Sequence, residues 1–176
     1  LKKDAGLRRE INAVLAGIGR AFKGNIKVKS FWRFLYEDLG PENLKVFIKK
    51  PLRGLRVAIH PGCRMVEELG LYDDAMNPTA LKKLVAILGA DVVDRPNELR
   101  CCGHPLSVID RELAVEKATE ILRSVHEAQA NCLCVFCPAC FSQFRLALSR
   151  NRQLKIKLAY YLELLGSAMG IISNLR

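Results

Sequence analysis

The sequence predicts an α/β fold in which a small, mainly parallel sheet is flanked by helices and preceded by a helical extension. Three observations support this class. Short apolar runs alternate with helical patterns from Leu55 onward, amphipathic helical patterns precede them, and the main cysteines fall just after the apolar runs. Strands that alternate with helices are typical of parallel sheets, which carry functional residues in loops at the carboxyl ends of their strands.

The first 50 residues predict a helical connecting segment. Residues 7–22 place apolar side chains at the spacing of one helix face, and Gly24-Asn25 ends that pattern. A second helix is expected after the cap residue Ser30 and stops at Gly40-Pro41. A segment with this much apolar surface needs a partner, either the core of the following domain or a further domain.

Residues 51–176 predict a cysteine-rich α/β domain. Strands are expected at 56–60, 90–94 and 132–136, and helices at 78–88, 111–130, 139–149 and 158–169. Asn77 followed by Pro78 is a typical helix start, and Asp110 is the expected cap of the helix at 111–130.

Five cysteines carry the expected chemistry of the chain. They are a single cysteine, an adjacent pair and a Cys-x-x-Cys turn: Cys63, Cys101, Cys102, Cys137 and Cys140. Each group follows a different predicted strand, and functional sites of open α/β sheets form outside the carboxyl ends of the strands. We therefore expect the five sulfurs to converge when the chain folds.

Such a cluster of cysteines can form disulfides, bind a zinc ion or hold an iron–sulfur centre. Seven cysteines in 176 residues, with no apolar signal sequence, do not fit a disulfide framework and favour a reducing compartment. Zinc is satisfied by four ligands and leaves one sulfur over. An iron–sulfur centre is normally held by thiolates alone and suits five of them better, while zinc stays open as the alternative.

The positions of the cysteines on the backbone separate ligands from core residues. Cys101 and Cys102 would point to opposite faces of a regular strand, so both serve one centre only if the chain turns, which Gly103 permits. Cys132 and Cys134 lie inside a buried strand and are expected to pack in the core.

The order of the five cysteines resembles a known family, the cysteine-rich (CCG) domain of the B subunit of heterodisulfide reductase. Its pattern is one cysteine, then Cys-Cys-Gly, then Cys-x-x-Cys, which Cys63, Cys101-Cys102-Gly103 and Cys137-Pro138-Ala139-Cys140 match. The resemblance extends to the residues just before Cys63 and to the segment 158–166. Members of the family usually carry two copies of the domain, so this chain is interpreted as the second half of a longer subunit.

The resemblance implies a non-cubane [4Fe–4S] cluster at which a small anionic disulfide is reductively cleaved. The partners it implies are a ferredoxin-like iron–sulfur subunit, a flavoprotein or cytochrome subunit, and the missing first cysteine-rich domain. Two alternatives remain. One is an electron-transfer subunit of a 2-hydroxyacid (lactate or glycolate) or glycerol 3-phosphate dehydrogenase, and the other is a zinc-stabilised docking module.

Residues beside the cysteines suggest supporting roles. His104 is the candidate catalytic residue, as a proton donor to a departing thiolate, and His60 is a second candidate for that role or for a hydrogen bond to sulfur. Arg64 and Arg100 are the basic residues best placed to attract an anionic substrate.

The overall charge and hydropathy set the expected environment. The net charge is +10, but the basic residues are scattered along the chain, so no nucleic-acid partner is expected. No apolar run approaches the roughly 18 residues that span a membrane. We therefore expect a cytoplasmic protein. Any association with a membrane complex is expected to occur through other subunits.

Overall fold

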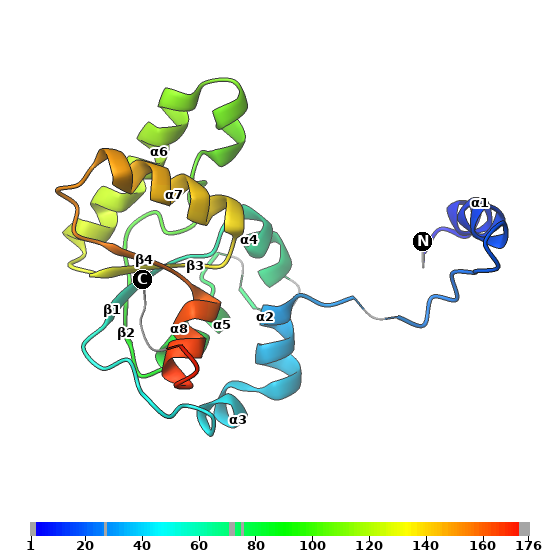
Figure 1. Ribbon diagram of the computed structural model, residues 1–176, viewed down its shortest axis with the longest axis horizontal. Coiled ribbons are helices and arrows are strands. Elements are labelled where there is room, and N and C mark those ends of the chain that lie inside the picture. Colours follow the sequence, from blue (N-terminus) through cyan, green and yellow to red (C-terminus); the bar gives the residue numbers. More distant parts are fainter. Residues whose placement is uncertain (1–2, 27, 71–72, 75, 173–176) are drawn as a thin grey trace. The chain divides into compact units, whose positions relative to one another are not determined.

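A computed structural model of the chain describes residues 3–26, 28–70, 73–74 and 76–172 (Figure 1). The chain divides into two compact units, Leu1–Phe34 and Leu35–Arg176. The first unit contains helices α1 (Ala5–Ala16) and α2 (Phe31–Arg33). The predicted connecting segment 1–50 runs across this division and stays a prediction.

The second unit contains the sheet and its covering helices. Its strands are β1 (Arg56–His60), β2 (Asp91–Val93), β3 (Cys132–Val135) and β4 (Lys157–Tyr160). Its α-helices are α3 (Pro41–Lys45), α4 (Cys63–Leu69), α5 (Ala80–Ala86), α6 (Arg111–Glu127), α7 (Pro138–Arg150) and α8 (Tyr161–Ala168). A π-helix, η1 (Phe34–Leu39), precedes α3, and a 3₁₀-helix, η2 (His104–Val108), precedes α6.

The four strands form one parallel sheet in the order β2-β1-β3-β4. Strands β1 and β3 are central, and every residue of β3 is buried because helices cover both of its faces. The topology confirms the predicted α/β class. Because the strands are parallel, the carboxyl ends of β1 and β3 lie side by side at the same edge of the sheet, where ligand sites of such folds form.

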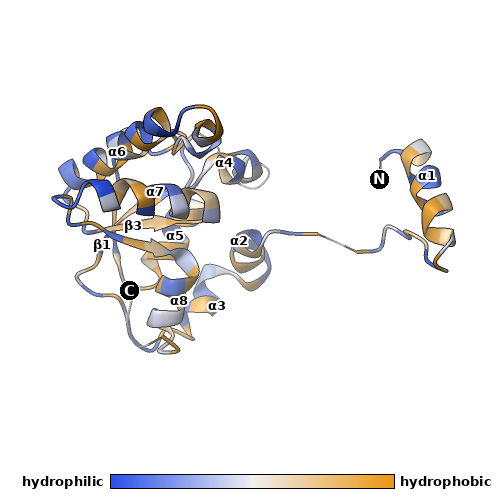
Figure 2. Cartoon of the chain, turned by 45° about the horizontal axis from the view of Figure 1, so that its top comes forward, coloured by the Kyte–Doolittle hydropathy of each residue, from blue (hydrophilic) through white to orange (hydrophobic). Residues whose placement is uncertain are grey.

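Helices α6 and α7 lie on one face of the sheet, and α5 and α8 lie on the other (Figure 1). Ala58, Leu133 and Val135 point into the first layer and pack with apolar residues of α6 and α7. In the second layer the Tyr161 hydroxyl donates a hydrogen bond to the carbonyl oxygen of Leu84, which joins α8 to α5. Figure 2 shows that β3 is hydrophobic while α6 carries many hydrophilic residues.

Several elements differ from the sequence prediction, and α3 and η2 are among those that were not predicted. Helix α1 ends at Ala16 rather than near residue 22, because the chain turns at Gly17 and Gly19 adopts a positive φ of 67°. The segment predicted as the start of the last helix is strand β4, since residues 157–160 pair with β3. Helix α4, which begins at Cys63, was not predicted at all.

The helix caps are partly as predicted. The Asp110 side chain accepts a hydrogen bond from the Leu113 N–H and caps α6 as expected. Helix α5 is different, because Asn77 makes no cap there. Instead, one carboxylate oxygen of Asp73 accepts hydrogen bonds from the N–H groups of Thr79 and Ala80, each 2.6 Å long.

Replacing Asp73 with alanine is expected to lower the free energy of unfolding at neutral pH by about 1–2 kcal/mol, as for the loss of other caps. Burial alone would raise the pKa of Asp73, but hydrogen bonds from Ala80, Asp74 and Thr79 lower it overall. The contribution of Asp73 is therefore present at neutral pH and is lost as the pH falls through the lowered pKa of the folded state. Urea unfolding near pH 7 and near pH 3 measures this.

The matched control is Asn77→Ala, which removes the cap that the sequence suggested. It should change the free energy of unfolding by less than about 0.5 kcal/mol, as is usual for exposed positions. A larger loss for Asn77→Ala than for Asp73→Ala would show that the helix is capped as the sequence predicted.

Candidate functional site

The five candidate ligands lie where strands end and helices begin. Cys63 is the first residue of α4, three residues after β1. Cys137 follows β3 and is the N-cap of α7, and Cys140 lies in the first turn of the same helix. The Cys101-Cys102 pair lies in the loop between β2 and η2. Helix N-termini carry partial positive charge and stabilise thiolates, so these positions favour ligand chemistry.

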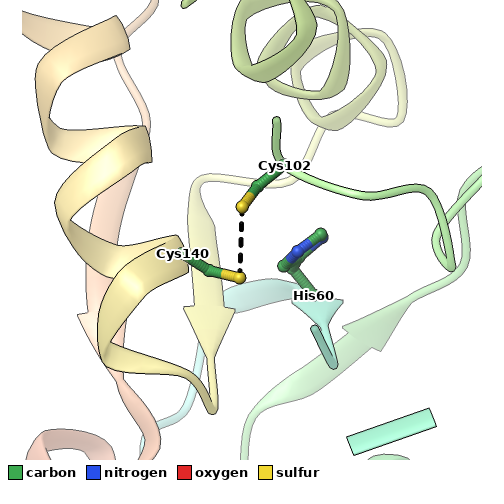
Figure 3. A group of neighbouring side chains, drawn as sticks. All are labelled: His60, Cys102 and Cys140. Carbon is green, nitrogen blue, oxygen red and sulfur yellow. Dashed lines mark hydrogen bonds between the residues drawn. The ribbon is translucent and has the colours of Figure 1, made fainter. Parts of the chain in front are cut away.

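Cys102, Cys140 and His60 form the buried floor of the site. The sulfurs of Cys102 and Cys140 are 3.3 Å apart, although they come from different elements (Figure 3). Their ligand atoms and those of His60 all lie within 4.8 Å of one another. Both sulfur residues are at most 3% exposed, and His60 is fully buried.

The other three thiols form a more open rim around this floor. Cys63 and Cys101 are exposed, and Cys137 is half-buried. The Cys101 thiol interacts with those of Cys102 and Cys63, and the Cys140 thiol interacts with that of Cys137. Cys63 is thus a neighbour of Cys101, and Cys137 a neighbour of Cys140 on the floor, so a group bound at the floor would be reached from the exposed side that carries Cys63 and Cys101.

The groups around its sulfur make Cys102 the more acidic of the two thiols of the floor. The contact with the Cys140 thiol, the nearby His60 ring and the backbone N–H of His104 together lower the pKa of Cys102 to about 4. The pKa of Cys140 is raised instead, first by its contact with Cys102 and then by burial and by Cys137. When the two sulfurs hold one proton between them, Cys140 is therefore the thiol and Cys102 is the thiolate. The negative charge of Cys102 favours the binding of a cation.

His60 is buried with both ring nitrogens lacking a hydrogen-bond partner among the described residues. Its ring packs edge-on against Phe144 of α7, with the ring centroids 4.8 Å apart. Burial lowers the pKa of His60, so the imidazole is neutral at neutral pH. An unpaired buried polar group costs free energy, and a group bound at the adjacent sulfurs would supply the missing partner.

Two glycines shape the loops that present the sulfurs. Gly103 has a φ of 82°, which provides the turn that both Cys101 and Cys102 need. The turn also directs the N–H of Gly103 toward Cys101 and the N–H of His104 toward Cys102. Gly62 has a φ of 85°, and a Cβ atom there would lie 3.1 Å from the Cβ of Cys137 and 3.4 Å from the sulfur of Cys140.

Replacing Gly62 with alanine is expected to reduce metal binding. The positive φ costs about 1 kcal/mol for an alanine, and the new methyl group would displace Cys137 from its place beside Cys140. Metal content of the purified variant, compared with that of Gly54→Ala, checks this. Gly54 also has a positive φ but has no atom within 4 Å of an added Cβ, so strain alone would reduce the metal content of both variants equally.

Cys132 and Cys134 are fully buried, as predicted, and belong to the opposite face of the sheet. Successive residues of a strand alternate between faces, so these two point away from the face that carries Val135. In the register of β1 and β3, His60 pairs with Val135 and shares the face of that residue. Burial raises the pKa of Cys132 to about 12 and that of Cys134 well above its usual value. Both stay neutral thiols of the core.

The structure places the two candidate histidines differently. The His60 side chain faces the sulfurs, whereas His104 is half-exposed at the start of η2 and directs its backbone N–H at Cys102. The alternation of side chains along the predicted strand 56–60 was a sequence signal for the position of His60. It puts the His60 side chain on the same face of the strand as Ala58, and in the structure Ala58 packs under α6 and α7. Arg64 and Arg100, each next to a ligand candidate, are both exposed.

The donor set fits a polynuclear group better than a single ion. Within the described part of the chain, all seven cysteines are free thiols, so the disulfide alternative has no support. A tetrahedral zinc ion would use His60, Cys102, Cys140 and one more ligand, and it would leave rim sulfurs over. In an iron–sulfur cluster the thiolates are shared among several irons. This suits a site in which two sulfurs form a compact floor and three form a separate rim.

Comparison with known proteins agrees with the cysteine pattern. The family model described as "Cysteine-rich domain" (CCG) matches residues 57–145. The chain is 34% identical, over 180 residues, to the B subunit of the Ferredoxin/F(420)H(2)-dependent CoB-CoM heterodisulfide reductase of Methanosarcina acetivorans. That match covers 97% of this chain and 59% of the relative.

Other relatives widen the range of functions. The chain is 32% identical, over 182 residues, to the B subunit of the Ferredoxin:CoB-CoM heterodisulfide reductase of Methanosarcina mazei, covering 97% of this chain and 59% of the relative. It is 30% identical, over 179 residues, to the 8-methylmenaquinol:fumarate reductase membrane anchor subunit of Wolinella succinogenes, covering 96% of this chain and 61% of the relative. The helices of the described ranges include none that is long and apolar enough to cross a membrane.

The chain thus spans about three fifths of the length of these relatives, all of them subunits of reductases by name. The family match includes all five candidate ligands, all of β3 and β1 from Val57 onward, and it confirms the resemblance inferred from the cysteine pattern. The chain therefore belongs to the CCG family of cysteine-rich domains, and within it the chain is similar to the B subunits of heterodisulfide reductases.

Proposed function

We propose that the chain is the cluster-binding domain of a reductase subunit, and that Cys63, Cys101, Cys102, Cys137 and Cys140 hold a non-cubane [4Fe–4S] cluster. The observation that supports this most strongly is the meeting of two buried free thiols, Cys102 and Cys140, beside the buried His60 imidazole, which has no partner among the described residues. A zinc-stabilised docking module is the alternative, since His60, Cys102 and Cys140 lie close enough for one ion.

The reaction we propose is the reductive cleavage of a small anionic disulfide, in which two electrons and two protons convert one S–S bond into two thiols. When bound, the cluster supplies the electrons one at a time. The exposed rim formed by Cys63 and Cys101 gives the disulfide access, while the buried floor keeps water from the inner sulfurs. His104, half-exposed beside Cys102, is our candidate donor of a proton to a departing thiolate.

The chain would act within a larger cytoplasmic complex. We propose a ferredoxin-like iron–sulfur subunit and a flavoprotein or cytochrome subunit as the sources of electrons, and a first cysteine-rich domain as the neighbour of this one. The names of two heterodisulfide reductase relatives include ferredoxin, which supports a ferredoxin-like source of electrons. Association with a membrane would then occur through other subunits.

An electron-transfer role without disulfide chemistry is the second candidate. The similarity to a fumarate reductase membrane anchor subunit favours it, because the name of that relative indicates no disulfide substrate. In the same class we place an electron-transfer subunit of a 2-hydroxyacid or glycerol 3-phosphate dehydrogenase. Such a subunit would use the same cysteines as a relay, and its His104 would have no proton to deliver.

Metal and sulfide analysis of the full chain purified without oxygen tests the cluster. Close to four irons and four sulfides per chain are expected, whereas one zinc ion without sulfide would establish the docking module. A thiol added to the oxidised protein then separates the two redox functions. A new paramagnetic signal is expected for disulfide chemistry, and an unchanged spectrum indicates a relay.

A further inference from the structure

A hollow of about 390 Å³ lies directly beside Cys101. One wall is a face of α6 formed by residues at helical spacing, and the other is the loop that leads from β2 to the cysteine pair. The lining residues are Lys117, Glu120, Ile121 and Ser124 on the helix and Arg95, Asn97, Arg100 and Cys101 on the loop. The volume falls within the usual range for small-molecule sites.

The lining of this hollow is cationic. Arg95, Arg100 and Lys117 contribute three positive charges, and Glu120 is the single carboxylate among the described lining residues. Lys117 and Glu120 form a half-exposed ion pair of 3.1 Å, while Arg100 is exposed. The excess of positive charge, next to an exposed sulfur ligand, is what an anionic ligand needs.

Arg95 is a buried guanidinium that holds the hollow in shape. It is 6% exposed, and its Nη2 donates to the carbonyl oxygens of Ile59 and Glu98, each at 3.3 Å. Its Nη1 donates to the Ser124 hydroxyl, also at 3.3 Å, and so ties the loop to α6. Its Nε–H is buried and has no partner among the described residues. Burial lowers the pKa of Arg95 to about 10, so it stays charged at neutral pH.

An adjoining hollow shares Arg95, Asn97 and Arg100 with the first. Its additional cation, Lys82, is already paired with Asp94 and Glu98 at 2.8 Å and 2.9 Å. The first hollow therefore has the stronger attraction for an anion and is the one that contains Cys101.

We propose that this hollow binds the anionic end of the substrate, a carboxylate, sulfonate or phosphate group carried by a small thiol or disulfide. Arg100 and Lys117 contact the anion, Arg95 positions the loop, and the sulfur end of the ligand lies toward Cys101. The proposal rests on the proposed function for the presence of a cluster at Cys101, but the binding of the anion itself depends only on the lining residues.

Binding of thiodipropionate to the full chain, measured by calorimetry, tests this proposal. The ligand is a thioether with two carboxylates, so it neither exchanges with thiols nor accepts electrons, and its diamide is a neutral control of the same length. The dianion is expected to bind about tenfold more tightly than the diamide, as hydrogen bonds to charged groups are the stronger ones. Equal binding of the two would overturn the proposal.

Variants locate the binding site. Arg100→Gln should weaken binding of the dianion about tenfold, and Lys117→Gln should do so more, because it also leaves Glu120 unpaired beside the anion. Glu120→Gln should strengthen binding severalfold, an effect that no misfolded variant produces. Arg123→Gln, on the same helix but outside the hollow, should change it by less than about twofold. Equal losses for Arg100→Gln and Arg123→Gln would mean that only the overall charge attracts the anion.

Iron analysis of the same samples separates this proposal from the proposed function. If the chain binds the dianion but carries no iron, the anion site is supported and the cluster is refuted. If the chain carries iron but binds the dianion and the diamide equally, the cluster is supported and the anion site is refuted.

Discussion

The Cys102→Ala variant is expected to lose the metal centre, with iron per chain falling about tenfold or more, since even the loss of residues around metal ligands lowers affinity by 10- to 100-fold. Cys102 lies 3.3 Å from Cys140, is adjacent to Cys101 and lies beside His60. The pKa of its thiol is lowered, so Cys102 is the thiol of the floor that ionises most readily to the thiolate that binds a metal. Iron analysis after purification without oxygen measures this effect.

The matched control is Cys134→Ala, which removes the same atom from a site that is just as buried. Cys134 lies on the opposite face of the sheet and stays a neutral thiol. This variant should lower the free energy of unfolding by about 1 kcal/mol, through the small cavity that it leaves, and should keep its iron. Equal iron loss from both variants would show that the metal responds to stability rather than to Cys102 as a ligand.

The His60→Leu variant is expected to have opposite effects on the metal-free and iron-loaded protein. Without metal, leucine removes a buried imidazole whose two nitrogens have no partner among the described residues, and the free energy of unfolding should rise by about 1–3 kcal/mol. With iron bound, the variant loses a hydrogen-bond donor to the sulfurs, so the reduction potential should become more negative. Urea unfolding and a redox titration followed by paramagnetic resonance measure the two effects.

Two further variants make the histidine experiment specific. His126→Leu makes the same substitution at an exposed position of α6 and should leave both the stability and the potential near their original values. His60→Gln retains an N–H donor and should recover part of the potential. A metal-free His60→Leu variant that is less stable than the original chain would contradict the assignment of His60 to the bound group.

Local sequence signals predicted most of the elements that position the site. Strand β1 has the predicted bounds, 56–60, and α6 begins after Asp110 as predicted. These predictions succeeded because strand and cap preferences depend on neighbouring residues. Strand β4 was interpreted as part of a helix, since four residues contain too little periodicity to separate the two and their identity as a strand depends on pairing with β3.

The order and spacing of the cysteines, by themselves, determined which family the chain resembles and which sulfurs are candidate ligands, and the apolar strand pattern around Cys132 and Cys134 assigned these two to the core. Tertiary structure alone decided that His60 faces Cys102 and Cys140, and that Arg95, Arg100 and Lys117 meet beside Cys101. The physical reason is that these contacts join residues far apart in the chain, and the register of β1 on β3 and the packing of α6 and α7 bring them together.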